Sequence, residues 1–229
     1  MIPVRKGSKR VPLKNIREIC GKPLLYYVVE AARKATLVED LVVSTEDSFI
    51  ADIAKRLGVK VLTRPSIFAS DEIPLAVVMR DILETYDSVE DYYDAILSLQ
   101  ATSPLVSSDT IDEVIAKFHE ERCSAVATIS RIKQGHPYLS KRIVNSIAKD
   151  FVRVPNVRLY PKRNLEASYY FNGALFLRDR CLLADYDYTT NALGSRVTVV
   201  EMNEEESVNI DTEFDFKIAK LLLEARRNK

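Results

Sequence analysis

Residues 1–23 read MIPVRKGSKRVPLKNIREICGKP, and the rest of the chain is organised around them. A short apolar start leads into a loop with six basic residues and no carboxylate before Glu18. Gly7 and Ser8 lie inside this basic run, where a small backbone approaches an anion closely and offers N–H donors. A strand, a glycine-containing basic loop and a helix together form an arrangement that receives phosphate groups, although the Walker pattern is absent. On charge alone, a solvated basic arm or a nucleic-acid patch is an equal alternative.

The composition indicates one globular domain over residues 1–229. Apolar residues make up 47% of the chain and charged residues 29%, which is ordinary for a soluble protein and argues against disorder. Thirty-three basic residues balance thirty-three acidic ones. A neutral chain with a basic N-terminal loop concentrates positive potential locally, which favours a small anionic ligand over a nucleic acid.

The cysteine and histidine content argues against a zinc site and a disulfide framework. Cys20, Cys123 and Cys181 are far apart and odd in number, and the only histidines are His119 and His136. Reduced thiols of this kind fit a cytoplasmic protein. The sequence has no apolar run of membrane-spanning length and no signal-peptide core, so we expect no membrane association.

Apolar runs and helical periodicity alternate along the first 130 residues. The sequence predicts strands at 2–4, 41–44, 59–62, 95–99 and 124–129, and helices at 24–35, 46–57, 70–86 and 109–121. Ser108 is the expected N-cap of the last of these helices. This alternation predicts βαβ units, and therefore an α/β fold with a mainly parallel sheet covered on both faces.

The alternation stops at Arg131. Residues 131–164 are polar and basic, with weak strand signals at 140–147 and 151–154, and we interpret them as an extension or hairpin arm outside the main sheet. Such an arm buries little by itself, so a second subunit is its expected packing partner, with an ordinary surface loop as the alternative. A core strand at 172–177, a short helix at 178–183 and a strand at 196–201 follow. Thr212 and Asp215 form a capping box for the last helix.

Four polar segments follow predicted strands and are expected at one edge of the sheet, where open α/β sheets bind ligands. These are the basic loop, Ser44-Thr45-Glu46-Asp47, Thr63-Arg64-Pro65 and Gln100-Ala-Thr-Ser-Pro104. They would gather cations, amides and hydroxyls in one pocket. From the residues alone, this describes a nucleotide or sugar-phosphate site and no more.

The same segments resemble a known family. Residues 4–15, VRKGSKRVPLKN, followed by GKPL at 21–24, are similar to the signature of the CMP–sialic acid synthetases (acylneuraminate cytidylyltransferases). Further segments resemble later motifs of that family, and they follow in the same order. They are residues 43–47, 62–65 with 69–71, 99–105, 172–174 and 207–213. The resemblance covers nearly the whole chain and implies a three-layer, Rossmann-like nucleotidyltransferase fold.

The resemblance implies a reaction and its partners. CTP and a 2-keto sugar acid, such as N-acetylneuraminate, legionaminate or pseudaminate, would give a CMP-sugar and pyrophosphate with the help of Mg²⁺. The family also implies a homodimer in which residues 131–164 reach the partner subunit. The nucleophile would be the anomeric hydroxyl of the sugar, which attacks the α-phosphorus in line, so positioning and charge neutralisation supply the catalysis.

Residue roles carry over from the same resemblance. Arg5 and Lys9 would hold the triphosphate, with the backbone of Gly7 and Ser8, and Lys14 would neutralise charge at the α-phosphate or the leaving pyrophosphate. Asn15, Arg64 and Ser70 would frame the cytidine. Gln100, Thr102 and Ser103 would face the sugar acid or the base, and Lys162, Tyr170 and Asn172 would belong to the sugar pocket. Asp211 would ligate Mg²⁺, with Asn209 beside it. Lys6, Arg10 and Arg17 would be surface charges.

The departures from the family lie mainly on the sugar and metal side. Asn209 replaces a usual aspartate, and a neutral amide oxygen is a weaker ligand for Mg²⁺. Tyr170 stands where sialate enzymes usually have an arginine, and Pro74 and Leu75 stand where hydroxyl residues are common. The alternatives are therefore a related nucleotidyltransferase for another base or sugar, and a non-catalytic nucleotide-sugar binding protein. A nucleic-acid-binding module is the most distant reading.

Overall fold

The computed structural model describes residues 1–7, 11, 13–70, 72–87, 92–153, 164–188 and 191–227. The strands form two groups that meet edge to edge. The three parallel strands are β1 (Ile2–Pro3), β4 (Val42–Thr45) and β5 (Lys60–Thr63), in the order β1-β4-β5. The second group has the order β11-β7-β10-β6 and consists of β6 (Ala95–Leu99), β7 (Ala125–Arg131), β10 (Tyr169–Asp179) and β11 (Val197–Glu201).

Met1 joins the two groups. Its carbonyl accepts a hydrogen bond from the backbone N–H of Leu99 at 3.0 Å, and its amino group donates to the carbonyl of Leu97. The strands therefore make one continuous surface. Strand β10 runs antiparallel to both β6 and β7, whereas β11 and β7 are parallel. The predicted α/β fold with a mainly parallel sheet is confirmed, with β10 as its antiparallel exception.

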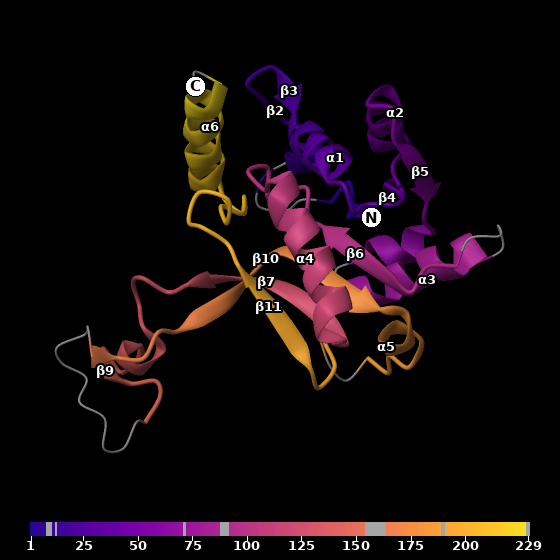
Figure 1. Cartoon of the computed structure of the whole chain (residues 1–229). Helices are drawn as coiled ribbons and strands as arrows, with labels where there is room; N and C mark the ends of the chain where they lie inside the picture. Colours follow the sequence, from indigo (N-terminus) through magenta and orange to yellow (C-terminus); the bar gives the residue numbers. More distant parts are fainter. Residues whose placement is uncertain are drawn as a thin grey trace.

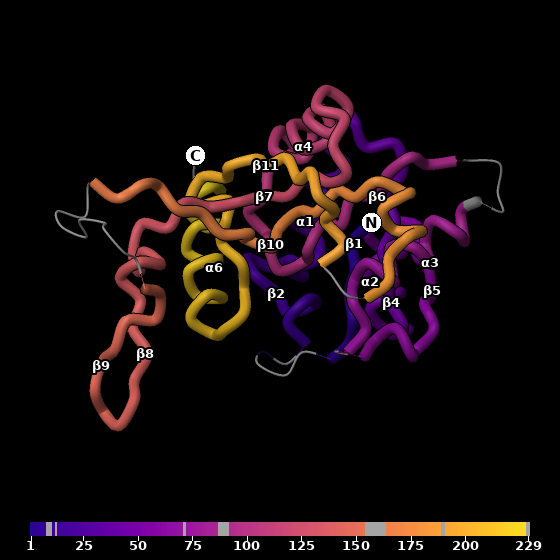
Figure 2. The backbone as a smooth tube through the Cα atoms, turned by 90° about the horizontal axis from the view of Figure 1, so that it is seen from below, coloured from indigo at the N-terminus to yellow at the C-terminus, as the bar shows by residue number. Residues whose placement is uncertain are grey.

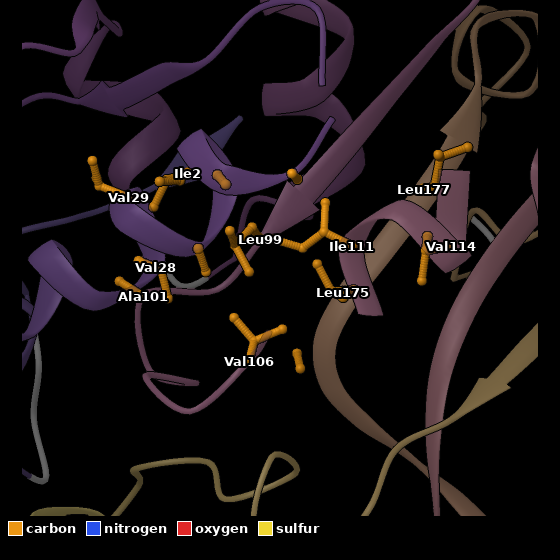
Figure 3. Close-up of a cluster of buried hydrophobic side chains, with 14 of the residues drawn as sticks. Ile2, Val28, Val29, Leu99, Ala101, Val106, Ile111, Val114, Leu175 and Leu177 are labelled. Atoms are coloured by element: carbon orange, nitrogen blue, oxygen red, sulfur yellow. The ribbon is translucent and has the colours of Figure 1, made fainter. Parts of the chain in front are cut away.

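Helices cover both faces of this surface. They are α1 (Leu24–Lys34), α2 (Ser48–Arg56), α3 (Leu75–Asp87), α4 (Ser108–Glu121), α5 (Arg180–Ala184) and α6 (Glu213–Arg227). Apolar side chains of α1, α2 and α4 pack on one face, in the core cluster shown in part in Figure 3. Side chains of α3 and α5 pack with Val42 and Ile96 on the other face. Helix α6 joins a third cluster with Ile19, Leu24 and Leu105, at one end of the sheet.

The helix boundaries follow from caps that the structure makes explicit. Ser107, not the predicted Ser108, caps α4, because its hydroxyl accepts the backbone N–H of Thr110 at 3.1 Å while Ser108 is already helical. Two adjacent serines offer the same side chain, and only the backbone geometry selects between them. The predicted capping box is confirmed: Thr212 Oγ1 accepts from Asp215 N at 3.2 Å, and Asp215 Oδ2 accepts from Thr212 N at 2.7 Å.

The structure contains two hairpins with two-residue turns, of which the first was not predicted and the second lies in the predicted hairpin arm. Strands β2 (Glu18–Ile19) and β3 (Lys22–Pro23) pair across Cys20 and Gly21, whose φ angles are 52° and 75°. Strands β8 (Lys141–Val144) and β9 (Ile147–Asp150) pair across Asn145 and Ser146, with φ of 49° and 64°. Two consecutive positive φ angles are typical of the type I′ turn, which matches the twist of a hairpin. The prediction of one strand over 140–147 was therefore wrong, because the chain reverses at Asn145.

Strands β8 and β9 project away from the body of the protein, as both views show (Figures 1 and 2). Every residue of the two strands is exposed, and Ile143 is 79% exposed. The short 3₁₀ helix η3 (Pro137–Leu139) connects β7 to this hairpin. The structure thus shows the predicted extension outside the main sheet. Residues 154–163 of the predicted arm lie outside the described residues.

Within the described residues, none of the helices combines the length and the apolar character that a membrane span requires.

Candidate functional site

A cavity of about 510 Å³ lies where the polar segments meet. Three short elements carry parts of its wall: the loop after β1, the 3₁₀ helix η1 (Lys14–Ile16), and the segment from β5 through the 3₁₀ helix η2 (Ser66–Ala69) into α3. The loop after β6 and the segment before α6 complete it. The lining residues are Pro3, Arg5, Gly7, Lys14, Asn15, Arg64, Phe68, Ser70, Ile73, Leu75, Val78, Gln100, Ala101, Thr102 and Asp211.

Lys14 connects the basic loop to the segment before α6. Its Nζ donates to the carbonyl of Ile210 at 2.5 Å and lies 3.3 Å from Asp211 Oδ1. The Lys14 side chain is only 12% exposed, whereas that of Asp211 is 45% exposed. This half-buried ammonium lines the cavity, where an anion would compete with Asp211 for it. Arg17, one position after η1, forms an ion pair with Glu213 and so also connects the basic loop to the start of α6.

Arg5 is held by contacts on both sides of the cavity. Asn15 Nδ2 donates to the carbonyl of Arg5 at 3.3 Å, and Arg5 Nη1 donates to the carbonyl of Ala69 at 3.4 Å. The first contact fixes the backbone of the basic loop against η1. The second contact brings the guanidinium to η2, so Arg5 spans the mouth between the loop and the β5–α3 segment.

Glu46 links the basic loop to Arg64. Its Oε1 accepts the backbone N–H of Lys6 at 2.9 Å, and its Oε2 accepts Nε and Nη2 of Arg64 at 3.1 and 2.9 Å. Burial by itself would raise the pKa of Glu46, but the hydrogen bonds from Lys6 and Arg64 outweigh it and hold the pKa below its usual value. Asp47 lies 3.0 Å from Lys6 Nζ. Lys6, expected to be only a surface charge, is thus an anchor for the loop.

One wall of the cavity is apolar and was not predicted. Phe68, Ile73, Leu75 and Val78 line it, with Leu75 and Val78 one helical turn apart on α3. The sequence signal was present, because Leu75 stands where hydroxyl residues are common. The cavity lining is therefore mixed: Lys14 and Asp211 come from η1 and the segment before α6, and apolar side chains come from the stretch between η2 and α3.

Several predicted site residues lie in this cavity, and others do not. Arg5, Gly7, Lys14, Asn15, Arg64, Ser70, Gln100, Thr102 and Asp211 line it. Ser103 is fully buried, and its hydroxyl has no hydrogen-bond partner among the described residues. Tyr170 is 50% exposed on β10, near the arm. Ser8, Lys9 and Lys162 lie outside the described residues.

Asn172 belongs to a buried hydrogen-bond network. Thr128 Oγ1 donates to Asn172 Oδ1 at 2.6 Å, and Asn172 Nδ2 donates to Ser130 Oγ at 3.0 Å. Gly173 follows with a φ of 78°, at the point where the pairing of β10 with β7 shifts register. The pairing of β10 with β7 is therefore interrupted at the Asn172-Gly173 step, between the pairs Phe171–Ile129 and Phe176–Ala127.

Few of the described residues could ligate a metal at this cavity. No group of three or more His, Cys, Asp and Glu side chains is placed to hold a metal within the described ranges. Asp211 is the carboxylate that lines the cavity. Asn209 Oδ1 is buried without a hydrogen-bond partner among the described residues. Mg²⁺ usually takes one or two carboxylates together with phosphates and waters, so this donor set fits a metal that relies on the nucleotide.

The sequence matches the family described as Cytidylyltransferase over residues 1–220. The chain is 28% identical over 94% of its length to an N-acylneuraminate cytidylyltransferase of Streptococcus agalactiae serotype III, and spans about half of that relative, 51%. It is 35% identical over 58% of its length to a CMP-N,N′-diacetyllegionaminic acid synthase of Legionella pneumophila, covering 57% of that protein.

The fold is similar to that of a CMP-2-keto-3-deoxy-manno-octonic acid synthetase complexed with CTP. The TM-score is 0.71 at 20% identity, over 98% of this chain and 97% of the other. At that identity the likeness concerns the fold alone. The match over residues 1–220 carries the assignment: the chain belongs to the cytidylyltransferase family that includes the CMP–sialic acid synthetases.

Proposed function

We propose that the protein is a cytidylyltransferase that activates a 2-keto sugar acid with CTP, forming a CMP-sugar and pyrophosphate. The observation that carries this proposal is the mixed lining of the cavity, which combines the charged groups of Arg5, Lys14 and Asp211 with an apolar wall. A nucleotide has the same combination, in its phosphates and its planar base. Family membership and relatives named for sialic and legionaminic acids support a nonulosonic acid as the second substrate.

In the proposed reaction, an oxygen–phosphorus bond forms and another breaks at the α-phosphorus. The anomeric hydroxyl of the sugar attacks and loses its proton, and pyrophosphate leaves with the electron pair of the broken bond. Lys14 neutralises the charge that develops at the α-phosphate and on the leaving group, while Arg5 and the backbone of the basic loop orient the β- and γ-phosphates. Catalysis by such preorganised charges needs no covalent enzyme intermediate.

Mg²⁺ is the proposed metal, held by Asp211 with the phosphates of the nucleotide. When bound, it would add positive charge at the phosphate oxygens. Asn209 offers a buried amide oxygen to the same region. Because this ligand is neutral, we expect the metal to rely more on the nucleotide than it does with two protein carboxylates.

A homodimer through the arm is proposed as the working assembly. The hairpin β8–β9 exposes Ile143 and Ile147, and the neighbouring segment Tyr169–Phe171 exposes three aromatic side chains. Exposed apolar residues gathered on an extension are typical of an interaction surface. Two copies related by a twofold axis would bury each other's arms. The three cysteines are unpaired, which together with CTP as a co-substrate supports a cytoplasmic location.

The test is an assay of pyrophosphate release. The full chain is incubated with each of the four nucleoside triphosphates and a panel of nine-carbon sugar acids, the eight-carbon Kdo and sugar 1-phosphates, with and without Mg²⁺. Release with CTP and a nine-carbon acid is expected. Turnover only with UTP or GTP would indicate a related nucleotidyltransferase, and CTP binding without any turnover would indicate the non-catalytic alternative that the residues at 170 and 209 suggest.

A further inference from the structure

We propose that Glu46 is a positioning residue that makes Arg64 recognise the nucleobase and keeps it from binding phosphate. This inference rests on the proposed function, because it concerns which part of CTP Arg64 meets. A guanidinium in a triphosphate site would normally bind phosphate oxygens, because its planar fork of donors matches them. Arg64 lines the cavity, yet its side chain is only 5% exposed and its charge is already paired.

The pairing occupies one edge of the guanidinium. Nε and Nη2 both donate to Glu46 Oε2, and Nη1 makes no hydrogen bond to any residue in the described part of the chain. With its charge compensated, Arg64 still has donors but attracts an anion much less strongly. Such a group suits an uncharged acceptor, and cytosine offers two of them, O2 and N3, whereas uracil carries a hydrogen at N3.

The surroundings of Arg64 also favour the base. The lining residues that follow Arg64 in the chain include Phe68, Ile73 and Leu75, so the segment that carries Arg64 also supplies the apolar part of the lining. A planar base packs against apolar side chains, and a triphosphate does not. Lys14 and Asp211 form the charged pair elsewhere in the wall.

Only a carboxylate can satisfy both neighbours of Glu46. Oε1 accepts from Lys6 N–H and Oε2 accepts from Arg64, so both ends of the side chain must be acceptors. A glutamine has one acceptor end and one donor end, so it leaves either the loop or Arg64 without its partner. Glu46→Gln therefore removes the compensation of Arg64 with almost no change in side-chain size.

The matched control is Asp47→Asn. Asp47 also pairs with Lys6, at 3.0 Å from its Nζ, and caps α2 by accepting the backbone N–H of Ile50. Asparagine keeps the capping function. This variant removes the same unit of charge one residue away, and neither its side chain nor the bonds it changes involve Arg64. Glu46→Asp is the conservative variant, because it restores two acceptor ends on a shorter side chain.

The experiment is calorimetric titration of the full-length protein and the three variants with CTP, UTP and inorganic pyrophosphate, alongside thermal unfolding. Losing a hydrogen bond to a charged group predicts that Glu46→Gln lowers the CTP-to-UTP affinity ratio about tenfold. The uncompensated Arg64 also raises pyrophosphate affinity. Asp47→Asn keeps the ratio within about twofold, and Glu46→Asp recovers part of it.

Three results would overturn this role: an unchanged ratio in Glu46→Gln, an equal loss in Asp47→Asn, or a uniform weakening that includes pyrophosphate. The last of these would mean that Glu46 only supports the loop. The proposed function fails separately, in the turnover assay, since these titrations need no sugar acid. A wild-type protein that binds UTP as tightly as CTP would defeat the cytidine specificity and this role with it.

Discussion

The nucleotide side of the molecule and the arm side differ in how completely one copy of the chain builds them. Around Lys14 and Arg64, polar groups are paired across loops that are distant in sequence, and the side chains are mostly buried. Along β8, β9 and Tyr169–Phe171, side chains are exposed, and Figure 2 shows the hairpin lying apart from the rest of the fold. One copy of the chain thus builds the whole proposed nucleotide cavity, whereas we expect the arm side to be completed by a second subunit.

The largest effect is expected on the nucleotide side. Lys14→Ala should lower the rate of pyrophosphate release by about tenfold to a thousandfold, the range seen when one transition-state charge contact is removed. Steady-state kinetics with CTP measure the effect. Lys55→Ala is the matched control, because Lys55 is exposed on α2 and does not line the cavity. Equal rates for the Lys14 variant and the wild type would remove Lys14 from the reaction.

The second effect concerns assembly. Ile143 pairs with Ala148 and Ile147 pairs with Val144, so the two isoleucines lie on opposite faces of the exposed hairpin. Replacing both by Asp places a charge on each face, so the proposed dimer should dissociate to a monomer. Light scattering measures the mass, and titration with CTP should give a Kd within about twofold of the wild type. A double variant that stays dimeric places the interface elsewhere. One that loses CTP binding while folded contradicts the independence of the two sides.

The third effect is on the stability of the buried hydrogen-bond network between β7 and β10, which lies between the cavity and the arm. Thr128 is fully buried, donates to Asn172 Oδ1, and accepts the backbone N–H of Leu175 at 3.1 Å. Thr128→Val should reduce the free energy of unfolding by about 1–3 kcal/mol, because it leaves buried polar groups unpaired. Denaturant titration measures this loss. Ser98→Ala, which removes one buried hydroxyl that donates to Phe176 O on the same strand β10, should cost less.

The smallest effect is expected at the proposed metal site. Asn209→Asp adds a carboxylate close to Asp211, so the Mg²⁺ concentration for half-maximal turnover should fall several-fold, on the order of the gain from one charged ligand. A metal titration of both proteins measures it. Superimposable titration curves would show that position 209 does not contact the metal.

The sequence predicted the scaffold better than the details of the site. The strand at 95–99 has the predicted bounds, because its apolar run is bordered by polar residues on both sides. The hairpin β2–β3 has two-residue strands, which are too short to show an alternating pattern. The turn at Asn145-Ser146 depends on two positive φ angles that serine rarely adopts, so the local signal was weak.

Within the site, chain order predicted which segments meet but not which side chains pair. The segment containing Glu46 was expected beside the basic loop, and it lies there. Its bonds to Lys6 and Arg64 depend on side-chain directions that three separate strands set together, and sequence spacing contains no such information. The apolar wall was missed for a related reason: Phe68, Ile73 and Leu75 read as core residues until the cavity beside them is known.

The contact between Lys14 and Ile210 has a consequence for how the protein is made. The two residues are 196 positions apart, and so are Arg17 and Glu213. At a ribosomal rate of about 5–20 residues per second, the basic loop emerges roughly 10–40 s before its counterpart exists. Strands β1, β4, β5 and β6 can assemble during that interval, but the ammonium of Lys14 then has no carbonyl to meet. The nascent chain therefore acquires its scaffold early, and its candidate site is completed among the last events of synthesis.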